Sequence, residues 1–344
     1  MFMLKKVLKL FLVFIFIVSS GFIHFMNFYP DRTLFILTGQ AQGTTYSIKY
    51  IHSSYTIDNK AIQYLLSDID QSLSLYQPTS RISQFNAARR YTKADVHLLK
   101  VVQRSISITA ATDGCFDITA KPISNLWGFN AQLPKSIPSD KMLQTALQSV
   151  GAHHLSFQKD SLIKDIPSTQ IDCDGIAQGY TVDQLSLFLR NKGIVDFMVE
   201  LGGEVFSSGK NLTGTDWIVG IEAPEAFTGD AHLVSKKISL SNMAITTSGS
   251  MKKYRKLGNR YWSHIVDPRT ALPVDNGIVS VTVIAPDAMT ADAYDNAFMV
   301  MGVNKAFVLA NSENCLGLYI VYANKDGSLS DTSNLYFKRF LVHE

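Results

Sequence analysis

Two carboxylates and one amide share a short segment late in the chain. Asp292, Asp295 and Asn296 are spaced at i, i+3 and i+4, and a helix would place all three on one face. Oxygens of this kind suit a hard cation such as Mg²⁺. The neighbours are small or apolar, which indicates that the acids are half buried and need a partner: Ala291, Ala293, Ala297, Phe298 and Met299. A solvated acidic face is the alternative, and the spacing alone does not decide between the two.

Residues 171–209 have the pattern of a strand, a turn and a helix. Residues 171–174 are an acidic strand end, Gly175 makes the turn, and a helix is predicted from about 176 to 191, with Gly193 at its C-cap. At such a place, backbone N–H groups of the helix N-terminus hold anions such as phosphate. A packed strand–helix unit that binds nothing is the alternative.

Three further groups of residues are candidates for binding or catalysis: a histidine, four aromatic residues and the cysteines. His264 lies three residues before Asp267, where it is a candidate proton acceptor or phosphate contact, although a lone strand histidine is more often structural. Four aromatic residues could stack on a flat ring or fill the core: Tyr76, Phe116, Trp127 and Phe129. The cysteines have neither CxxC nor metal-ligand spacing, so we expect no disulfide framework and no zinc site: Cys115, Cys173 and Cys315.

The composition is that of a globular protein. Of 344 residues, 46% are hydrophobic and 18% charged, which excludes a disordered chain. The net charge of +3 is too small for a nucleic-acid-binding surface.

The N-terminal residues carry a membrane signal. Lys5, Lys6 and Lys9 precede an uncharged, mostly apolar stretch at 10–29, which is long enough to cross a bilayer. The lysines favour a cytoplasmic N-terminus. We therefore expect residues 1–30 to anchor the protein in a bacterial inner membrane, with its bulk on the periplasmic side. A cleaved signal peptide that releases the protein to the periplasm is the alternative.

The predicted elements mix helices and strands without regular alternation, which favours an α+β fold. We expect a tether at 31–42, a folded domain at 43–344, and loops at 80–86 and 115–130. Apolar periodicity predicts helices at 60–77, 94–112, 138–150, 176–191 and 290–301. Strands are predicted at 43–53, 154–157, 216–221, 237–240, 260–265, 279–284, 317–322 and 335–341.

Eight blocks of sequence carry a family resemblance, and together they cover nearly all of residues 43–302. They are GTTYS (43–47), SLYQPTSRISQFN (74–86), DGCFDITAKPISNLWGF (113–129), IDCDGIAQGYTVD (171–183), VELGGEV (199–205), TTSGS (246–250), SHIVDPRTALPV (263–274) and ADAYDNA (291–297). In these blocks, and in their order, the chain resembles the ApbE-type FAD:protein FMN transferases. The resemblance implies a two-lobed mixed α/β domain with a largely antiparallel sheet, related to the T-fold, which binds FAD between its lobes with Mg²⁺ on the pyrophosphate.

The resemblance also implies roles for single residues. The family's metal positions are matched by Asp292, Asp295 and Asn296, and Gly175 would add a backbone carbonyl. FAD-contacting positions are matched by Gln42, Tyr76, Cys115, Phe116, Asp117, Asp172, Gln178 and Ile265. Three residues depart from the family pattern: Asn296 replaces the usual threonine, Gln178 replaces a frequent lysine, and Ala271 replaces a glycine.

The reaction that the resemblance implies is transfer of FMN from FAD to a threonine hydroxyl of an acceptor protein, with Mg²⁺ bound and AMP released. His264 is the candidate base or phosphate contact, and the implied acceptor is an outward-facing subunit of a membrane redox complex. Two alternatives stay open. One is an FAD pyrophosphatase that yields FMN and AMP. The other is a non-catalytic FAD-binding protein, which the departures at Asn296 and Gln178 make worth testing.

Overall fold

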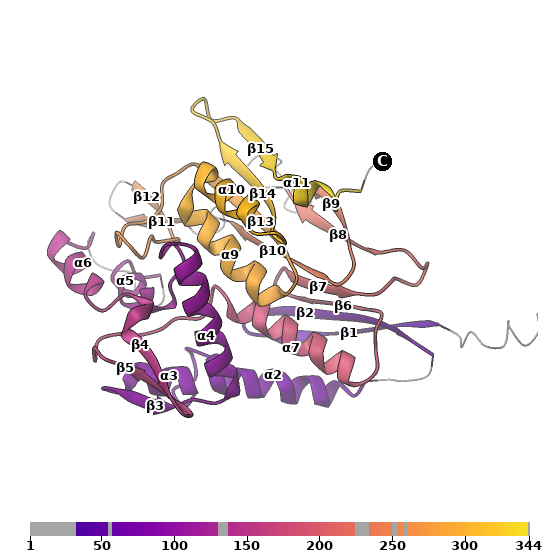
Figure 1. The fold of residues 1–344 in the computed structure, drawn as a ribbon, viewed down its shortest axis with the longest axis horizontal. Coiled ribbons are helices and arrows are strands. Elements are labelled where there is room, and N and C mark those ends of the chain that lie inside the picture. Colours follow the sequence, from indigo (N-terminus) through magenta and orange to yellow (C-terminus); the bar gives the residue numbers. More distant parts are fainter. Residues whose placement is uncertain are drawn as a thin grey trace, which may run out of the picture.

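An eight-stranded sheet runs through the molecule (Figure 1). The computed structural model describes residues 32–53, 57–129, 137–223, 234–249, 254–257 and 260–342, and the predicted anchor at 1–30 lies outside these ranges. In spatial order the strands are β1 (Thr33–Ala41), β2 (Thr44–His52), β6 (Phe197–Leu201), β7 (Glu204–Ser208), β10 (Met243–Gly249), β13 (Ile278–Ala285), β14 (Gly317–Ala323) and β15 (Leu329–Ser333). All neighbouring pairs are antiparallel, which confirms the predicted mixed fold with a largely antiparallel sheet.

Two helices cover one face of this sheet and carry the candidate site. They are α7 (Ala177–Asn191), which packs on β6 and β7, and α9 (Ala288–Met301), which packs on β10 and β13. The Asp287 side chain caps α9 by accepting from the Thr290 N–H, and Gly302 with φ 82° ends that helix. Gly193 follows α7 with φ 77°, so the predicted helix and its glycine C-cap are confirmed.

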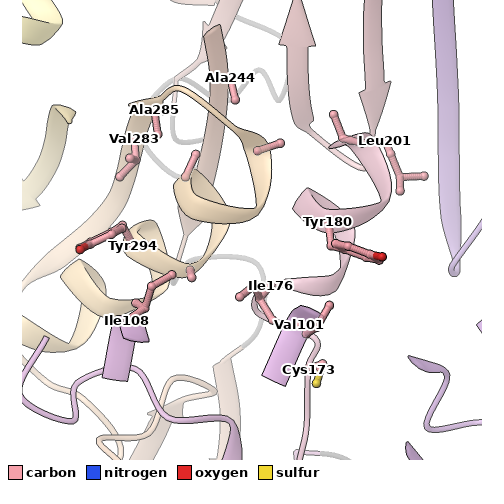
Figure 2. Close-up of a cluster of buried hydrophobic side chains, with 14 of the residues drawn as sticks. Val101, Ile108, Cys173, Ile176, Tyr180, Leu201, Ala244, Val283, Ala285 and Tyr294 are labelled. Atoms are coloured by element: carbon pink, nitrogen blue, oxygen red, sulfur yellow. The ribbon is translucent and has the colours of Figure 1, made fainter. Parts of the chain in front are cut away.

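A second helical layer lies over the first. It consists of α2 (Asn59–Leu73), which contacts α7, and α4 (Val96–Ala111), which contacts α9. Figure 2 shows the apolar side chains that fill the space between these layers, including Val101 and Ile108 of α4, Ile176 and Tyr180 at the start of α7, and Tyr294 of α9. This packing fixes the position of the N-terminal turn of α7 relative to α9.

Smaller units surround the layers. On the other face of the sheet, β8 (Trp217–Glu222), β9 (Val234–Leu240) and α11 (Leu335–Lys338) enclose a second apolar cluster. At one end, next to α4, lie β3 (Tyr91–Lys93), β4 (Leu155–Gln158), β5 (Ser161–Lys164), α3 (Arg81–Ala87), α5 (Lys121–Leu126) and α6 (Asp140–Leu147) (Figure 1). The remaining elements are β11 (Tyr254–Leu257), β12 (Arg260–Ser263) and α10 (Val303–Ser312). Within the described ranges, no helix has the length and apolar character needed to span a bilayer.

Several local predictions differ from the structure. Most of the expected tether at 31–42 is strand β1, which pairs with β2 from Thr33 to Ala41. The expected loop at 80–86 is helix α3, because Ser80 caps it by accepting from the Ser83 N–H. The loop expected at 115–130 contains a 3₁₀ turn and α5.

The final predicted strand at 335–341 is also wrong. It begins with α11, where Asn334 accepts from the Phe337 N–H. Aromatic residues there suggest a strand, but the asparagine cap overrides that preference.

Candidate active site

The two aspartates of α9 lie inside the protein, against the first turn of α7. Asp292 is 4% exposed and Asp295 is 1% exposed. The Gly179 N–H of α7 donates to Asp292 Oδ2 at 2.9 Å. A Cβ atom on Gly179 would lie 2.8 Å from the Asp292 Cβ and would also clash with the Ala288 carbonyl. The two helices can approach this closely only because glycine occupies that position.

The Gly175 turn meets α9 at Asn296. The amide nitrogen of Asn296 lies 3.0 Å from Asp295 Oδ1, 3.4 Å from Asp292 Oδ1 and 3.5 Å from the Gly175 carbonyl. The structure therefore brings together all four residues predicted as metal ligands, from two segments far apart in the sequence. Carboxylate, amide and carbonyl oxygens are the kinds of ligand that a hard cation prefers.

Asn86 holds the segment that leads into the Gly175 turn. Its side-chain amide donates to the Ile171 carbonyl at 2.9 Å and accepts from the Ile171 N–H at 2.8 Å. The fully buried Lys164 amine donates to the carbonyls of Asn86 and Thr169 at 3.3 and 2.8 Å, and burial lowers its pKa. The Asp172 N–H is fixed by the Ile118 carbonyl at 2.7 Å. The backbone that leads into the Gly175 turn is thus held by contacts from three segments, those of Asn86, Lys164 and Ile118.

A third acid, Glu204, lies close to the two aspartates. It follows the tight turn between β6 and β7, and it is buried. Burial raises the pKa of Glu204 to about 7. Burial first, and then the Glu204 carboxylate, raise the pKa of Asp292, while burial and Asp292 raise that of Asp295. When ionised, three buried acids so close together create a strongly negative local potential.

This potential suits a bound cation. Among the described residues, no lysine or arginine forms an ion pair with any of the three acids. The same ranges contain no group of three or more His, Cys, Asp or Glu side chains in a metal-binding arrangement. The predicted ligand set has only two such side chains and is completed by amide and carbonyl oxygens, which is a chemistry typical of Mg²⁺ rather than of zinc.

Asp183 attaches α9 to α7 from the other side. Its carboxylate accepts from the N–H groups of Ala288 and Met289 at 2.8 and 2.9 Å. Part of the side chain reaches the surface, but the carboxyl group is surrounded by protein, and burial raises its pKa to about 7. Asp183, Glu204 and Asn86 were not among the site residues predicted from the sequence. Each lies within a block that carried the family resemblance, but its role depends on a partner distant in sequence.

The predicted FAD contacts are spread over two neighbouring regions. Phe116 is buried, and its ring edge lies 3.5 Å from where a Cβ on Gly175 would be. Gln178 and Glu204 both border the Gly202 turn. Gln42 donates to Thr181 Oγ1 at 2.9 Å, while its own side-chain carbonyl is buried without a partner among the described residues. These residues surround the start of α7.

The side chains of the other predicted FAD contacts differ in solvent exposure and in the hydrogen bonds that they already form. Tyr76 is 87% exposed on the loop after α2. The Asp117 carboxylate accepts from Thr119 and from the Ala152 N–H, so it serves the local loop. Cys115 is buried, and burial raises its pKa. The side chain of Asp172 accepts from the Asp174 N–H at 2.9 Å.

A cleft of about 580 Å³ lies next to the Cys115–Asp117 loop. Its lining includes Asp113, Gly114, Asp117, Gly151 and Arg269. The Arg269 guanidinium forms two hydrogen bonds to Asp267, at 2.9 and 2.7 Å. Arg269, four residues after Ile265, therefore borders the loop predicted to contact FAD. A second cleft of about 440 Å³ lies between α4, α7 and α9 and includes Asp183.

Comparisons with known proteins agree with this architecture. The model of the ApbE family matches residues 42–320. An FAD:protein FMN transferase of Vibrio cholerae is 35% identical over 89% of this chain and 92% of its own length, and one of Escherichia coli K12 is 35% identical over 90% of each chain.

Solved structures with these names have the same fold. The flavin transferase ApbE from Vibrio cholerae has a TM-score of 0.80 at 35% identity, over 90% of this chain and all of that one. The apo form of the Pseudomonas stutzeri flavinyl transferase ApbE has a TM-score of 0.81 at 29% identity, over 90% of this chain and 97% of that one.

Proposed function

The chain belongs to the ApbE family, and from this membership we infer that it is a flavin transferase that takes FAD as substrate and moves FMN to an acceptor protein. The resemblance extends over about nine-tenths of the chain at 35% identity. The observation that carries the inference is the meeting of the Gly175 turn with the buried acids of α9.

We further propose that the acceptor group is a threonine hydroxyl. Its oxygen attacks the phosphorus next to riboflavin, and the bond from that phosphorus to the bridging oxygen breaks. AMP then leaves with the bonding electrons, and FMN stays joined to the acceptor through a phosphoester. The hydroxyl proton passes to a base, for which we propose His264. The support is that Arg269, five residues after His264 in the sequence, lies beside the Cys115–Asp117 loop: a Cβ on Gly114 would be 3.3 Å from the Arg269 Cγ.

The proposed cation is Mg²⁺, held by Asp292, Asp295, Asn296 and the Gly175 carbonyl. When bound, it would neutralise the pyrophosphate and the charge that shifts to AMP. The protein residues supply position: Asn86 fixes the turn, while Gly179 and Asp183 fix α9 against α7. Positioning and electrostatics contribute most of the rate in phosphoryl transfer.

A transfer assay tests these proposals. The full-length protein is incubated with FAD, MgCl₂ and an acceptor fragment, and the intact mass of the acceptor is measured alongside AMP. We expect the acceptor to gain one FMN, and we expect no gain with a chelator, with an acceptor Thr→Ala variant, or with the double variant D292N/D295N. Free FMN and AMP without acceptor modification would indicate a pyrophosphatase instead. Bound FAD without AMP would indicate a non-catalytic flavin-binding protein.

We also propose that residues 1–30 anchor the protein in the inner membrane, so that the domain acts on the periplasmic side. The acceptor would then be a membrane redox-complex subunit that faces the same compartment. The support is the order of Lys5, Lys6 and Lys9 before the apolar stretch at 10–29. Fractionation followed by protease treatment of spheroplasts tests this, because a periplasmic domain would be degraded and a cytoplasmic one protected.

A further inference from the structure

The side-chain amide of Asn296 is enclosed by oxygen atoms. Its nitrogen lies 3.0 Å from the Asp292 carbonyl and from Asp295 Oδ1, 3.4 Å from Asp292 Oδ1, and 3.5 Å from the Gly175 carbonyl. We propose that this NH₂ group substitutes for the cation in the metal-free protein and turns away when the cation binds. The inference rests on the proposed Mg²⁺-dependent function and adds a determinant of metal affinity to it.

Hydrogen-bond chemistry fixes the amide orientation without a cation. An amide nitrogen only donates, and backbone carbonyl oxygens only accept. The observed orientation therefore directs two N–H groups at four acceptors. In the opposite orientation, Asn296 Oδ1 would face the carbonyl oxygens of Asp292 and Gly175 with no hydrogen between them, which is unfavourable inside a protein.

A bound cation reverses this preference. Mg²⁺ contacts oxygen ligands at about 2.1 Å, and amide hydrogens pointing at it would repel it. A half-turn about the terminal side-chain torsion replaces NH₂ by Oδ1, and that torsion is broad and roughly two-fold in asparagine. The same residue thus supplies a donor to the acids in one state and an oxygen ligand in the other.

Ser248 makes both orientations acceptable. Its hydroxyl now donates to Asn296 Oδ1 at 3.4 Å, and a hydroxyl can equally accept from NH₂ after the turn. The amide therefore keeps a partner on its outer side in each state. Threonine, which the family resemblance implies at this position, has no NH₂ group to donate into the acid cluster.

Asn296 should therefore have two measurable effects. It should stabilise the metal-free fold, and it should weaken cation binding, because those hydrogen bonds break when the cation enters. Replacing it by threonine should tighten Mg²⁺ binding by about tenfold, the equivalent of one or two hydrogen bonds. N296D should have the least stable metal-free fold and the largest gain on adding metal, because it places a further carboxylate beside Asp292 and Asp295.

The experiment compares full-length wild type, N296T and N296D without FAD or acceptor. Thermal unfolding is followed in EDTA and in MgCl₂, and Mg²⁺ binding is measured by calorimetry. We expect N296T to unfold about 2 °C lower than wild type in EDTA and to bind Mg²⁺ more tightly. N304T is the matched control, because Asn304 is exposed on α10, and it should change neither value appreciably.

Two results would overturn the inference: an N296T protein as stable in EDTA as wild type, or one that binds Mg²⁺ equally or more weakly. The second result would make Asn296 a simple oxygen ligand. Because neither measurement contains FAD, the outcome is independent of flavin transfer. Failure of the transfer assay with the N296T effects present would count against the proposed function alone.

Discussion

Ala271 adopts a backbone conformation that favours glycine. Its φ is 60°, and a residue with a Cβ is strained there by about 1 kcal/mol. The residue is buried, and its carbonyl accepts from Trp127 Nε1 at 2.8 Å, so the strain is maintained by the surrounding contacts. This is the position where the resemblance implies a glycine.

We predict that A271G stabilises the protein by about 0.5 kcal/mol, the strain relieved less the extra backbone entropy of glycine. Urea unfolding measures this change. Ala88, which has φ −69°, is the control, and A88G should destabilise. Equal effects of the two substitutions would mean that the conformation at 271 carries no strain.

Glu204 contributes negative charge next to Asp292. We predict that E204Q weakens Mg²⁺ binding by about fivefold to tenfold, because a unit charge is removed a short distance from the proposed site. Calorimetry with MgCl₂ measures the affinity. The exposed acid Glu313 is the control, and E313Q should leave the affinity within twofold. An unchanged affinity in E204Q would separate Glu204 from the metal centre.

At this scale the sequence predicted the acids of α9 but not Glu204. Helical spacing places Asp292, Asp295 and Asn296 together using local geometry alone. Glu204 is adjacent to them only through the packing of β7 beside α7 and α9, and no local periodicity encodes that proximity. The same reason explains why Asn86 and Asp183 were not identified.

Asp183 connects two elements, because its carboxylate satisfies two N–H groups at the start of α9. We predict that D183A destabilises the protein by about 2–3 kcal/mol, since two N–H groups lose a charged acceptor. Urea unfolding measures the loss. Asp140, exposed in the first turn of α6, is the control, and D140A should cost less than about 0.5 kcal/mol.

Gly179 sets the distance between α7 and α9. We predict that G179A destabilises by about 1–3 kcal/mol, because its methyl group overlaps the Ala288 carbonyl and the Asp292 side chain. Mg²⁺ affinity should fall as well, since Asp292 loses its alignment. Gly249 on β10 is the control: a Cβ there makes only ordinary contacts at 3.7 Å or more. A G179A protein as stable as G249A would show that the helices adjust freely.

Long periodic helices were predictable at the element scale, and short capped ones were not. The apolar spacing of α7 extends over four turns, so its existence and its glycine end could be predicted. Helix α3 has only seven residues, and its signal is the Ser80 cap with Ile82 and Phe85 buried three positions apart. The mostly polar composition of residues 80–86 is typical of a loop, so this short helical pattern is not recognised from the sequence.

The whole molecule should lose stability with rising pH when metal is absent. The pKa of Glu204 and that of Asp183 are each raised to about 7 in the folded protein, against about 4 when unfolded. The folded state therefore holds protons that the unfolded state releases. Stability is highest below about pH 4.5 for these two groups and falls as pH rises through 7.

We predict that the free energy of unfolding in EDTA drops by on the order of 2 kcal/mol between pH 5.5 and 7.5. Saturating MgCl₂ should reduce the slope, because a cation stabilises the ionised acids. E204Q should reduce it without metal. Chemical unfolding at several pH values gives the slope directly, and a flat profile in EDTA would contradict the burial of these acids.

Strand β1 begins at Thr33 and pairs with β2 along nine residues. If residues 1–30 anchor the protein, then only residues 31 and 32 lie between the anchor and the sheet, and the three Cα–Cα steps from 30 to 33 reach roughly 10 Å. So short a linker would hold the domain close to the membrane. Its edge strand β1, with Leu34 and Ile36 exposed, would lie near the lipid headgroups. An acceptor would then have to present its threonine close to the bilayer surface, because the transferase domain could not move far from the membrane.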